Sequence, residues 1–387
     1  MLASVGRSTD ITCDFLKLCL QCRWDPQVYI KAQQLLEHST FDWNAFCDQV
    51  ESDNLAPLVS FLLADQDWIP ESTLGRLHKQ YIATAIQNTL LFRELASILS
   101  SLGNSDVKVV LLKGAALASQ IYPSIALRPM VDLDLLVLPA DTTQAIDSLR
   151  QLGYQEIRQE EQSGFTLQYE NEVALRKNAV IPILVEIHWN LFNSPYYQNK
   201  LSQEWLWNNT QTIPINDFSA RLLQPEIQFL HLCGHLSYHH SGQEVWLWYH
   251  DLAEMIMFYG ERLNWDELFD FAGKYDLLLS LKANLRILLG IYGPIIPRAV
   301  IATLEHTTPS AREQKYYPRL SSQKKSAGQI FWDDFNSLPG WRNKFHFAFS
   351  NLFPSPKYMQ NRYQIKHSIY LPIYYPYRWI RGILSLF

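Results

Sequence analysis

Cysteine is scarce in this chain of 387 residues. The odd count and the wide scatter exclude a disulfide framework as the basis of so long a fold. The five positions are Cys13, Cys19, Cys22, Cys47 and Cys233. Charged residues make up only 18% of the chain and hydrophobic residues 48%, which excludes wholesale disorder. A chain of this length and composition is expected to fold into two or three domains.

Targeting and membrane-spanning segments are also lacking. The N-terminus has acidic residues early, at Asp10 and Asp14, and does not show the basic, apolar and small-residue order of a signal peptide. Residues 368–387 are apolar, but a spanning helix needs about 20 mostly uninterrupted apolar residues, and here four residues interrupt the run: Pro372, Pro376, Arg378 and Arg381. We expect a docked tail, with an interfacial membrane anchor as the alternative, on a cytoplasmic protein.

The charge is unevenly distributed along the chain. Residues 301–387 hold 12 Lys and Arg against four acidic residues, a net charge of +8, so the preceding 300 residues carry −13. The basic residues alternate with aromatic ones, which predicts contact with RNA or an anionic membrane, or docking on the acidic body. They include Arg342, Lys344, Lys357, Arg362, Lys366, Arg378 and Arg381, among Trp341, Phe345, Phe347, Tyr358, Tyr363 and Trp379.

The hydrophobic pattern predicts a small mixed sheet between two helical regions. Helical spacing covers residues 10–105 and is clearest at 78–102, where Gly103 ends it. Residues 204–292 return to helical spacing, and the chain from 307 onward has only weak periodicity. Strands are expected at 107–112, 131–138, 165–169, 173–177 and 181–189, with helices at 115–122 and 141–152 and with 165–169 and 173–177 forming a hairpin.

Three acidic residues fall on these strands in a useful pattern. Asp132 and Asp134 are two residues apart, so an extended strand directs both to one face while the intervening leucines point to the other. Adjacent carboxylates on an apolar strand repel each other, and a divalent cation between them removes that repulsion. Glu186 on the strand at 181–189 is expected to reach the same face as a third metal ligand.

A second group of residues suits phosphate binding. Lys113 and Gly114 follow the first strand and begin a helix, whose N-terminus offers unpaired N–H groups, and glycine lets a phosphate approach the backbone. Arg128 lies four residues before Asp132, and its guanidinium suits a phosphate oxygen pair. We expect these three residues to hold a triphosphate.

The run at 111–137, LLKGAALASQIYPSIALRPMVDLDLLV, resembles the signature of the poorly characterised bacterial nucleotidyltransferase family, a branch of the polymerase-β-like superfamily. VEIHW at 185–189 is similar to the later acidic strand of that family. The resemblance implies Gly114 as the turn glycine, Asp132 and Asp134 as the metal pair and Glu186 as the third acid. Gly114-Ala115 stands where the superfamily commonly has Gly-Gly or Gly-Ser.

The resemblance implies an α+β fold, with a polymerase-β-like mixed sheet flanked by N-terminal and C-terminal helical regions. It also implies transfer of a nucleoside monophosphate from an NTP, such as ATP, to an unidentified small-molecule or macromolecular acceptor, with Mg²⁺ or Mn²⁺ as cofactor. The alternative is a catalytically inactive protein of the same fold that binds a nucleotide or a partner. The oligomeric state stays open. We expect four regions: a helical region at 1–105, the core at 106–200, a helical acceptor-side region at 201–300 and the basic tail at 301–387.

Other residues have more than one interpretation. His231, His235 and His239 share one face of a predicted helix, where packing or an acceptor-site role is preferred over zinc binding. His188 is expected to be either a hydrogen-bonded structural residue or a group behind the metal ligands. Asp251 is expected either to cap a helix or to line the cleft.

Overall fold

The computed structural model describes residues 11–37, 41–157, 165–194, 196–197, 200–215, 218–239, 245–322 and 326–384. The N-terminal residues on which the signal-peptide interpretation depends, and the last three residues of the apolar segment at 368–387, lie largely or wholly outside these ranges. Among the described residues, no helix is both long and apolar enough to cross a membrane.

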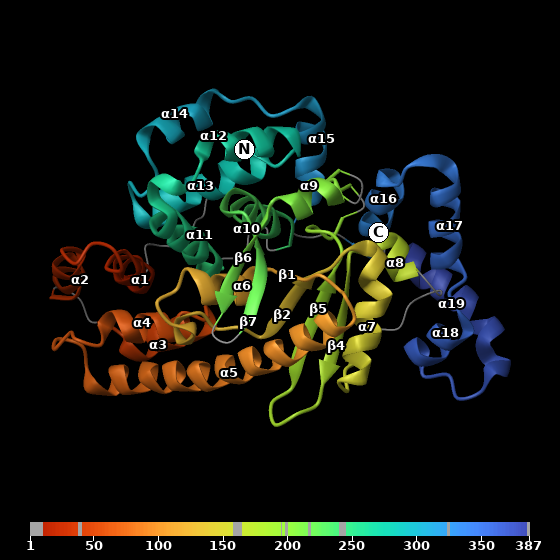
Figure 1. Cartoon of the computed structure of the whole chain (residues 1–387), viewed down its shortest axis with the longest axis horizontal. Coiled ribbons are helices and arrows are strands. Elements are labelled where there is room, and N and C mark those ends of the chain that lie inside the picture. Colours follow the sequence, from red (N-terminus) through yellow and green to blue (C-terminus); the bar gives the residue numbers. More distant parts are fainter. Residues whose placement is uncertain are drawn as a thin grey trace.

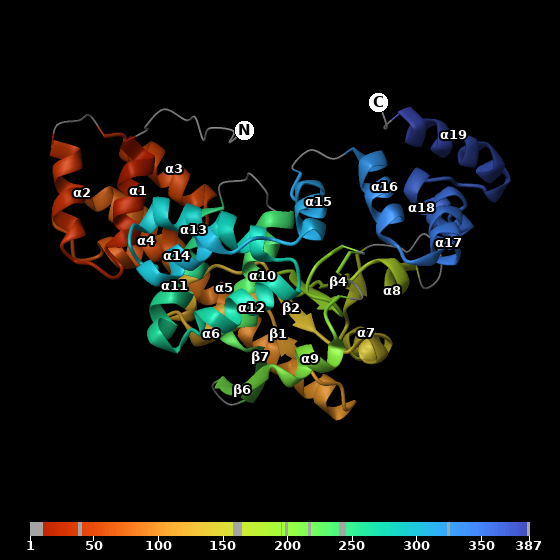
Figure 2. The ribbon, with the colours of Figure 1, turned by 90° about the horizontal axis from the view of Figure 1, so that it is seen from above.

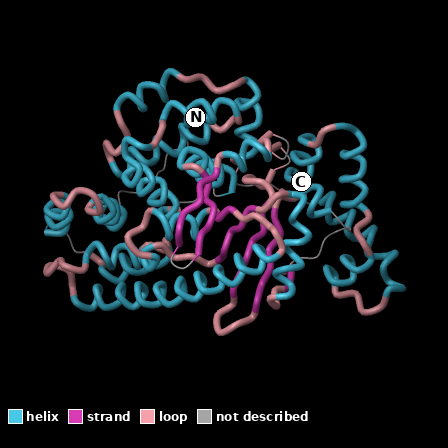
Figure 3. Tube along the Cα trace, in the orientation of Figure 1, coloured by secondary structure: helices cyan, strands magenta, loops and turns pink. Residues whose placement is uncertain are grey.

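A seven-stranded sheet forms the centre of the described structure, in the order β3-β4-β5-β2-β1-β7-β6 (Figures 1 and 3). It is mixed, because β2 pairs parallel with β5 and β1 pairs parallel with β7, whereas the other neighbours are antiparallel. Helices flank it on both sides in sequence, which confirms the predicted α+β class. The strands are β1 Val110–Leu111, β2 Asp132–Leu136, β3 Gln155–Glu156, β4 Glu172–Lys177, β5 Ile183–His188, β6 Thr210–Ile215 and β7 Phe218–Leu223.

One face of the sheet is entirely apolar in its central strands. Leu133, Leu135 and Val185 are fully buried there, in a core that includes residues of the long helix α5 (Glu71–Asn104) and of α7 (Thr142–Gln151). Residues Leu91, Leu95, Ile98 and Leu102 recur at helical spacing on α5, so that helix turns one apolar stripe toward the sheet. Figure 1 shows α5 running beneath the strands.

The other face lies toward a larger helical core. This core contains buried residues from α6 (Lys113–Gln120), α10 (Pro225–His239), α11 (Trp246–Tyr259), α12 (Trp265–Lys274) and α13 (Leu278–Tyr292). The N-terminal helices join it, because α1 contacts α13 and α4 contacts α5. They are α1 Ile11–Gln21, α2 Val28–Glu37, α3 Trp43–Ser52 and α4 Ala56–Leu63, so the helical prediction for this region is confirmed.

Two parts of the predicted strand pattern are wrong. Residues 165–169 form the short helix α8 (Phe165–Tyr169), and the hairpin forms instead between β4 and β5. One helical turn brings Phe165 and Tyr169 together, and both rings contact Phe347 from the C-terminal region. A tertiary partner from far along the chain therefore decides the local structure.

The region predicted to be helical from residue 204 also contains two strands. β6 and β7 follow the helix α9 (Gln203–Asn208) and form an antiparallel pair at the edge of the sheet. Each strand has only six residues, and their alternation of apolar and polar side chains is too short to stand out between strongly periodic helices. The sheet thus extends beyond residue 200, and the four-region division of the chain stays a prediction.

The C-terminal segment, in which the sequence shows only weak periodicity, is helical. After α14 (Arg298–His306) and α15 (Ala311–Leu320) come four helices that we call the C-terminal unit: α16 Ala327–Ser337, α17 Gly340–Leu352, α18 Pro356–Tyr363 and α19 Leu371–Leu384. Figures 1 and 2 place this unit at the opposite end of the molecule from α1 and α2. It is joined to the sheet region through α8, where the Tyr169 hydroxyl lies 2.8 Å from His346 Nδ1.

Candidate functional site

The register of β2 and β5 brings acidic residues together on the sheet face opposite α5. Asp134 stands beside Glu186, and Asp132 stands one pleat earlier beside Leu184. His188 follows Glu186 on the same face of β5, and Glu172 of β4 pairs with His188. The cluster therefore comes from three adjacent strands, which fix its spacing through their backbone hydrogen bonds.

Asp134 is the centre of this cluster and already has a cationic partner. Its carboxylate is 3% exposed and accepts a hydrogen bond of 2.6 Å from Lys113 Nζ, which also lies 3.9 Å from Glu186. Burial alone would raise the pKa of Asp134, but the charges of Lys113 and His188 and their hydrogen bonds bring it below its ordinary value. Asp134 is therefore ionised throughout the physiological range.

His188 lies among three carboxylates. Its Nε2 is 2.9 Å from Asp134 and 3.4 Å from Glu186, and its Nδ1 is 3.2 Å from Glu172. Burial favours the neutral ring, yet the hydrogen bonds to the three carboxylates raise the pKa of His188 well above its ordinary value. A protonated His188 can donate from both ring nitrogens, and it holds β2, β4 and β5 together at the site.

Asp132 differs from Asp134 because it forms no ion pair with a cationic side chain among the described residues. Burial, followed by the charges of Asp134 and Glu186, raises the pKa of Asp132 to about 7. It is also only partly buried, at the end of β2 where the strand begins. Asp132 is therefore the carboxylate with the most to gain from an added cation.

The donor set fits a divalent metal ion. One ligand atom each from Asp134, Glu186 and His188 can be chosen so that all three lie within 4.8 Å of one another. Carboxylate oxygens suit Mg²⁺ or Mn²⁺, and imidazole suits transition metals more than Mg²⁺. Asp132, predicted with Asp134 as the metal pair, lies one pleat away from this group on β2.

Lys113 and Gly114 have a special backbone at the start of α6. Lys113 has φ 43°, a left-handed value rare outside glycine, and this conformation accompanies the contact of its buried side chain with Asp134. A side chain on Gly114 would place its Cβ only 2.7 Å from Arg128 Nη1. The missing side chain of Gly114 thus makes room for the Arg128 guanidinium.

Arg128 is buried and held by two charged or polar partners. Its Nε and Nη2 donate to the two oxygens of Asp251 at 3.3 and 2.8 Å, and Nη1 donates to the Pro129 carbonyl at 3.0 Å. The Tyr122 hydroxyl donates to the same aspartate at 2.7 Å. Arg128 therefore links the connection before β2 to α11, and its predicted contact with a phosphate stays a prediction.

The connection between α6 and β2 is also held from the other side. The Asn88 amide on α5 donates to the carbonyls of Ile125 and Arg128, and Gln87 donates to the carbonyl of Met130. These bonds satisfy backbone acceptors in a segment that has only a single 3-10 turn, η1 (Ile125–Leu127), of its own. The segment leading to Asp132 is consequently fixed between α5 and α11.

Sequence reasoning missed Glu172 and left Asp251 open. Glu172 was predicted to lie in a turn, and only the β4–β5 register, which places it opposite His188, brings it to the cluster. Asp251 is fully buried and lines the helical side of the site through Arg128. Its neighbours in the sequence give no local signal of a partner more than a hundred residues earlier.

The three histidines of α10 lie on one helical face, as expected. His231 is buried, and burial followed by the charges of Lys113 and His188 lowers its pKa to about 3, so the ring is neutral. His235 stacks on His239 at 4.7 Å and on Trp248 at 4.4 Å between ring centroids. Among the described residues, the cluster that gathers ligand atoms is the one on β2 and β5, not this face.

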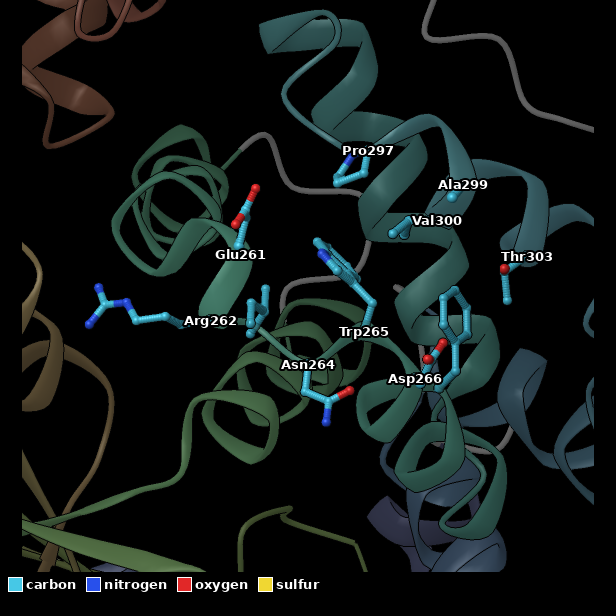
Figure 4. A pocket seen from close by; sticks show the side chains of 11 residues that line it. Glu261, Arg262, Asn264, Trp265, Asp266, Pro297, Ala299, Val300 and Thr303 are labelled. Atoms are coloured by element: carbon cyan, nitrogen blue, oxygen red, sulfur yellow. The ribbon is translucent and has the colours of Figure 1, made fainter.

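A separate hollow of about 570 Å³ opens on the helical region. Figure 4 shows Trp265, Asn264 and Asp266 at its floor and Pro297, Val300 and Thr303 along one wall. Its lining comes from η3 (Gly260–Arg262), α12 and α14, and none of the acidic cluster residues contributes. The hollow is therefore separate from the acidic cluster.

Comparisons with known proteins identify the family of the chain. Residues 39–290, more than half of the chain, match the model of a family described as uncharacterised nucleotidyltransferase, and the chain belongs to that family. No curated protein matches the sequence. A crystal structure of an antigenic nucleotidyltransferase-like protein from Paracoccidioides brasiliensis is similar with 13% identity and a TM-score of 0.31, over 60% of this chain and 95% of that one. This likeness is too loose to support a conclusion about fold or activity.

Proposed function

We propose that the chain is a metal-dependent nucleotidyltransferase that moves a nucleoside monophosphate from an NTP to an acceptor and releases pyrophosphate. The observation that carries this proposal is the gathering of Asp134, Glu186 and His188 on one sheet face, with Asp132 one pleat away. Membership of the nucleotidyltransferase family supports the same reaction class.

The acidic residues would hold Mg²⁺ or Mn²⁺ together with the triphosphate. A bound divalent cation supplies charge neutralisation for the phosphoryl group and its leaving pyrophosphate. Asp132 is the least neutralised carboxylate and would contribute most to cation binding, while Asp134 and Glu186 complete the set. Lys113 contacts Asp134 in the structure, and its ammonium group would bind a phosphate oxygen held beside that carboxylate.

The N-terminus of α6 would bind phosphate through its backbone. Residues 113–120 form a helix of eight residues, and its first residue, Lys113, contacts Asp134 of the cluster. Gly114 adds no side chain of its own at this turn, and Arg128 Nη1 and the Met130 side chain lie beside it. Arg128 and Asp251 would keep this turn in position beside Asp132.

The test is transfer of label from α-³²P-labelled NTPs, with Mg²⁺ or Mn²⁺, to components of a lysate from the native host. The Asp132→Ala and Asp134→Ala variants should each lose transfer, by at least about 10³-fold, because several kcal/mol of charge stabilisation is removed. Asp147→Ala, at an exposed ion pair on α7, is the matched control and should retain full activity. Full activity in the Asp132 or Asp134 variant would exclude the proposal.

A second function is favoured by the contacts of Asp134. Lys113 and His188 already neutralise this carboxylate, so the cluster is partly compensated without a metal ion. That arrangement suits a catalytically inactive protein that binds a nucleotide or a partner. Equilibrium binding of NTPs without label transfer, unchanged by added Mg²⁺, would favour this function over the enzyme.

A further inference from the structure

Two helices of the C-terminal unit expose large apolar side chains in the same spacing. On α17, Trp341, Phe345, Phe349 and Leu352 are exposed and follow one another at intervals of four, four and three residues. The turn η4 (Ser368–Tyr370) and α19 repeat the intervals with Ile369, Ile373, Tyr377 and Ile380, all exposed. This spacing aligns four side chains along one helical face. Each helix therefore presents an apolar stripe to the outside.

The inner sides of these helices account for the packing of the unit. Trp379 Nε1 donates to the Leu352 carbonyl at 2.7 Å, and Arg378 donates to the Asn351 carbonyl at 3.2 Å. Phe347 of α17 is buried against α8. Two stripe residues also contact rings of the unit, Tyr377 with Tyr363 at 5.9 Å and Phe349 with Phe353 at 5.1 Å between ring centroids. The other contacts named here use side chains outside the stripes, and the stripe side chains themselves stay exposed.

The charge of the same segment is of one sign. From residue 335 to the end of the chain there is no Asp or Glu, whereas seven Lys and Arg occur: Arg342, Lys344, Lys357, Arg362, Lys366, Arg378 and Arg381. Arg342 adjoins the stripe on α17 and Arg381 adjoins the stripe on α19, and both are exposed. A surface that combines apolar side chains with an excess of positive charge is complementary to an anionic, partly apolar partner.

The type of exposed side chain favours lipid over RNA. The three most exposed large apolar side chains near α19 are isoleucines, with 80%, 68% and 58% exposure at Ile369, Ile373 and Ile380. Base stacking needs aromatic or guanidinium planes, which isoleucine lacks. In contrast, insertion between lipid headgroups and acyl chains is favourable for any apolar side chain, because it removes apolar surface from water. Trp341, 73% exposed on α17, is of the type that favours the interface between membrane and water.

We propose that the C-terminal unit binds the surface of an anionic lipid membrane through the outer stripes of α17 and α19. The two helices would lie parallel to the membrane surface, because the 14 residues of α19 extend only about 21 Å and cannot span a bilayer. The stripes enter the boundary between headgroups and acyl chains, and the Lys and Arg residues contact lipid phosphates. This binding does not depend on the nucleotidyltransferase activity.

The test is co-sedimentation of the full chain with vesicles of phosphatidylcholine, alone or mixed with phosphatidylglycerol. The protein should bind the mixed vesicles, release from them as salt is raised, and not bind phosphatidylcholine alone. The double variants I373S/I380S and W341S/F345S should each weaken binding by at least about tenfold. Because all four positions are exposed, the variants should keep the circular dichroism spectrum and the melting temperature of the parent.

The matched control is I82S/I86S, which replaces two exposed isoleucines on α5 and should bind vesicles as the parent does. Absence of binding to anionic vesicles, or binding that neither double variant weakens, overturns the proposal. Two further results also overturn it. One is tighter binding to single-stranded RNA that is lost in W341S/F345S, which assigns the surface to nucleic acid. The other is a dimer in sedimentation velocity that I373S/I380S dissociates, which assigns the surface to a second copy of the chain.

Discussion

The acidic cluster and the C-terminal unit are organised by different forces. Around the cluster, charged side chains are buried and paired: Lys113 with Asp134, His188 with three carboxylates, Arg128 with Asp251. In the C-terminal unit, rings make the contacts, as between Phe353 and Trp379 and between Phe331 and Phe347. Charges there stay near the surface.

This difference indicates two different tasks. Burying charges costs free energy unless each has a close partner, so a network of this kind fixes side chains to within narrow limits, as phosphoryl transfer requires. Exposed apolar stripes beside a basic surface become favourable only when a partner covers them. We therefore expect the two regions to respond differently to the same type of mutation.

The largest expected contrast concerns removal of an arginine. Arg128→Ala leaves Asp251 as an uncompensated buried charge and should lower the free energy of unfolding by about 3–5 kcal/mol. Arg378→Ala, which removes a partly exposed arginine 5.4 Å from the Tyr358 ring, should cost no more than about 1 kcal/mol. Urea unfolding of both variants measures the two values. Equal losses would contradict the division between the regions.

The next contrast concerns pH in the metal-free protein. The folded pKa of Asp132, about 7, lies above its ordinary value of 3.8, so the fold binds this proton more tightly than the unfolded chain does. The protonated Asp132 therefore adds to the free energy of unfolding below about pH 4, and this added stability is lost as the pH rises toward 7. In EDTA at pH 8, Asp132→Asn should therefore stabilise the protein, by at most about 4 kcal/mol. Melting temperatures at pH 5 and pH 8 test this, and an unchanged difference between wild type and variant would refute it.

A smaller effect is expected at Gly114. Gly114→Ala places a Cβ against Arg128 Nη1, so the arginine must shift from its position beside Asp251. We expect a loss of about 1–3 kcal/mol and weaker NTP binding, measured by calorimetry. Gly382→Ala on exposed α19, where an added Cβ meets nothing within 4 Å, is the control and should change neither quantity.

The smallest effect is expected where the two regions join. Tyr169→Phe removes the hydroxyl that bonds to His346 and to the Asn343 carbonyl, and should cost about 1 kcal/mol. The loss should appear as faster amide exchange in α16 and α17, with no change at β2 or β5. Faster exchange at β5 would instead mean that the two regions unfold as one unit.

Local sequence signals were strong enough to locate most of the central elements. The period-two pattern at VDLDLLV and the apolar run ILVEIH gave β2 and β5, and alternation alone placed Asp132 and Asp134 on one face. The long stripe on α5 was equally clear, although the helix begins seven residues before the predicted 78–102 pattern. In contrast, the helical state of 165–169 depends on Phe347, which lies far along the chain.

The sequence by itself determined the family, the α+β class and the pairing of carboxylates on one strand, because these depend on periods of two and 3.6 residues and on a contiguous motif. Only the tertiary structure decided that Glu172 and His188 join Asp134, that Arg128 is held by Asp251, and that β6 and β7 complete the sheet. Strand register and helix packing set those contacts between residues that are far apart in the sequence. A local sequence pattern therefore does not predict which residues become partners.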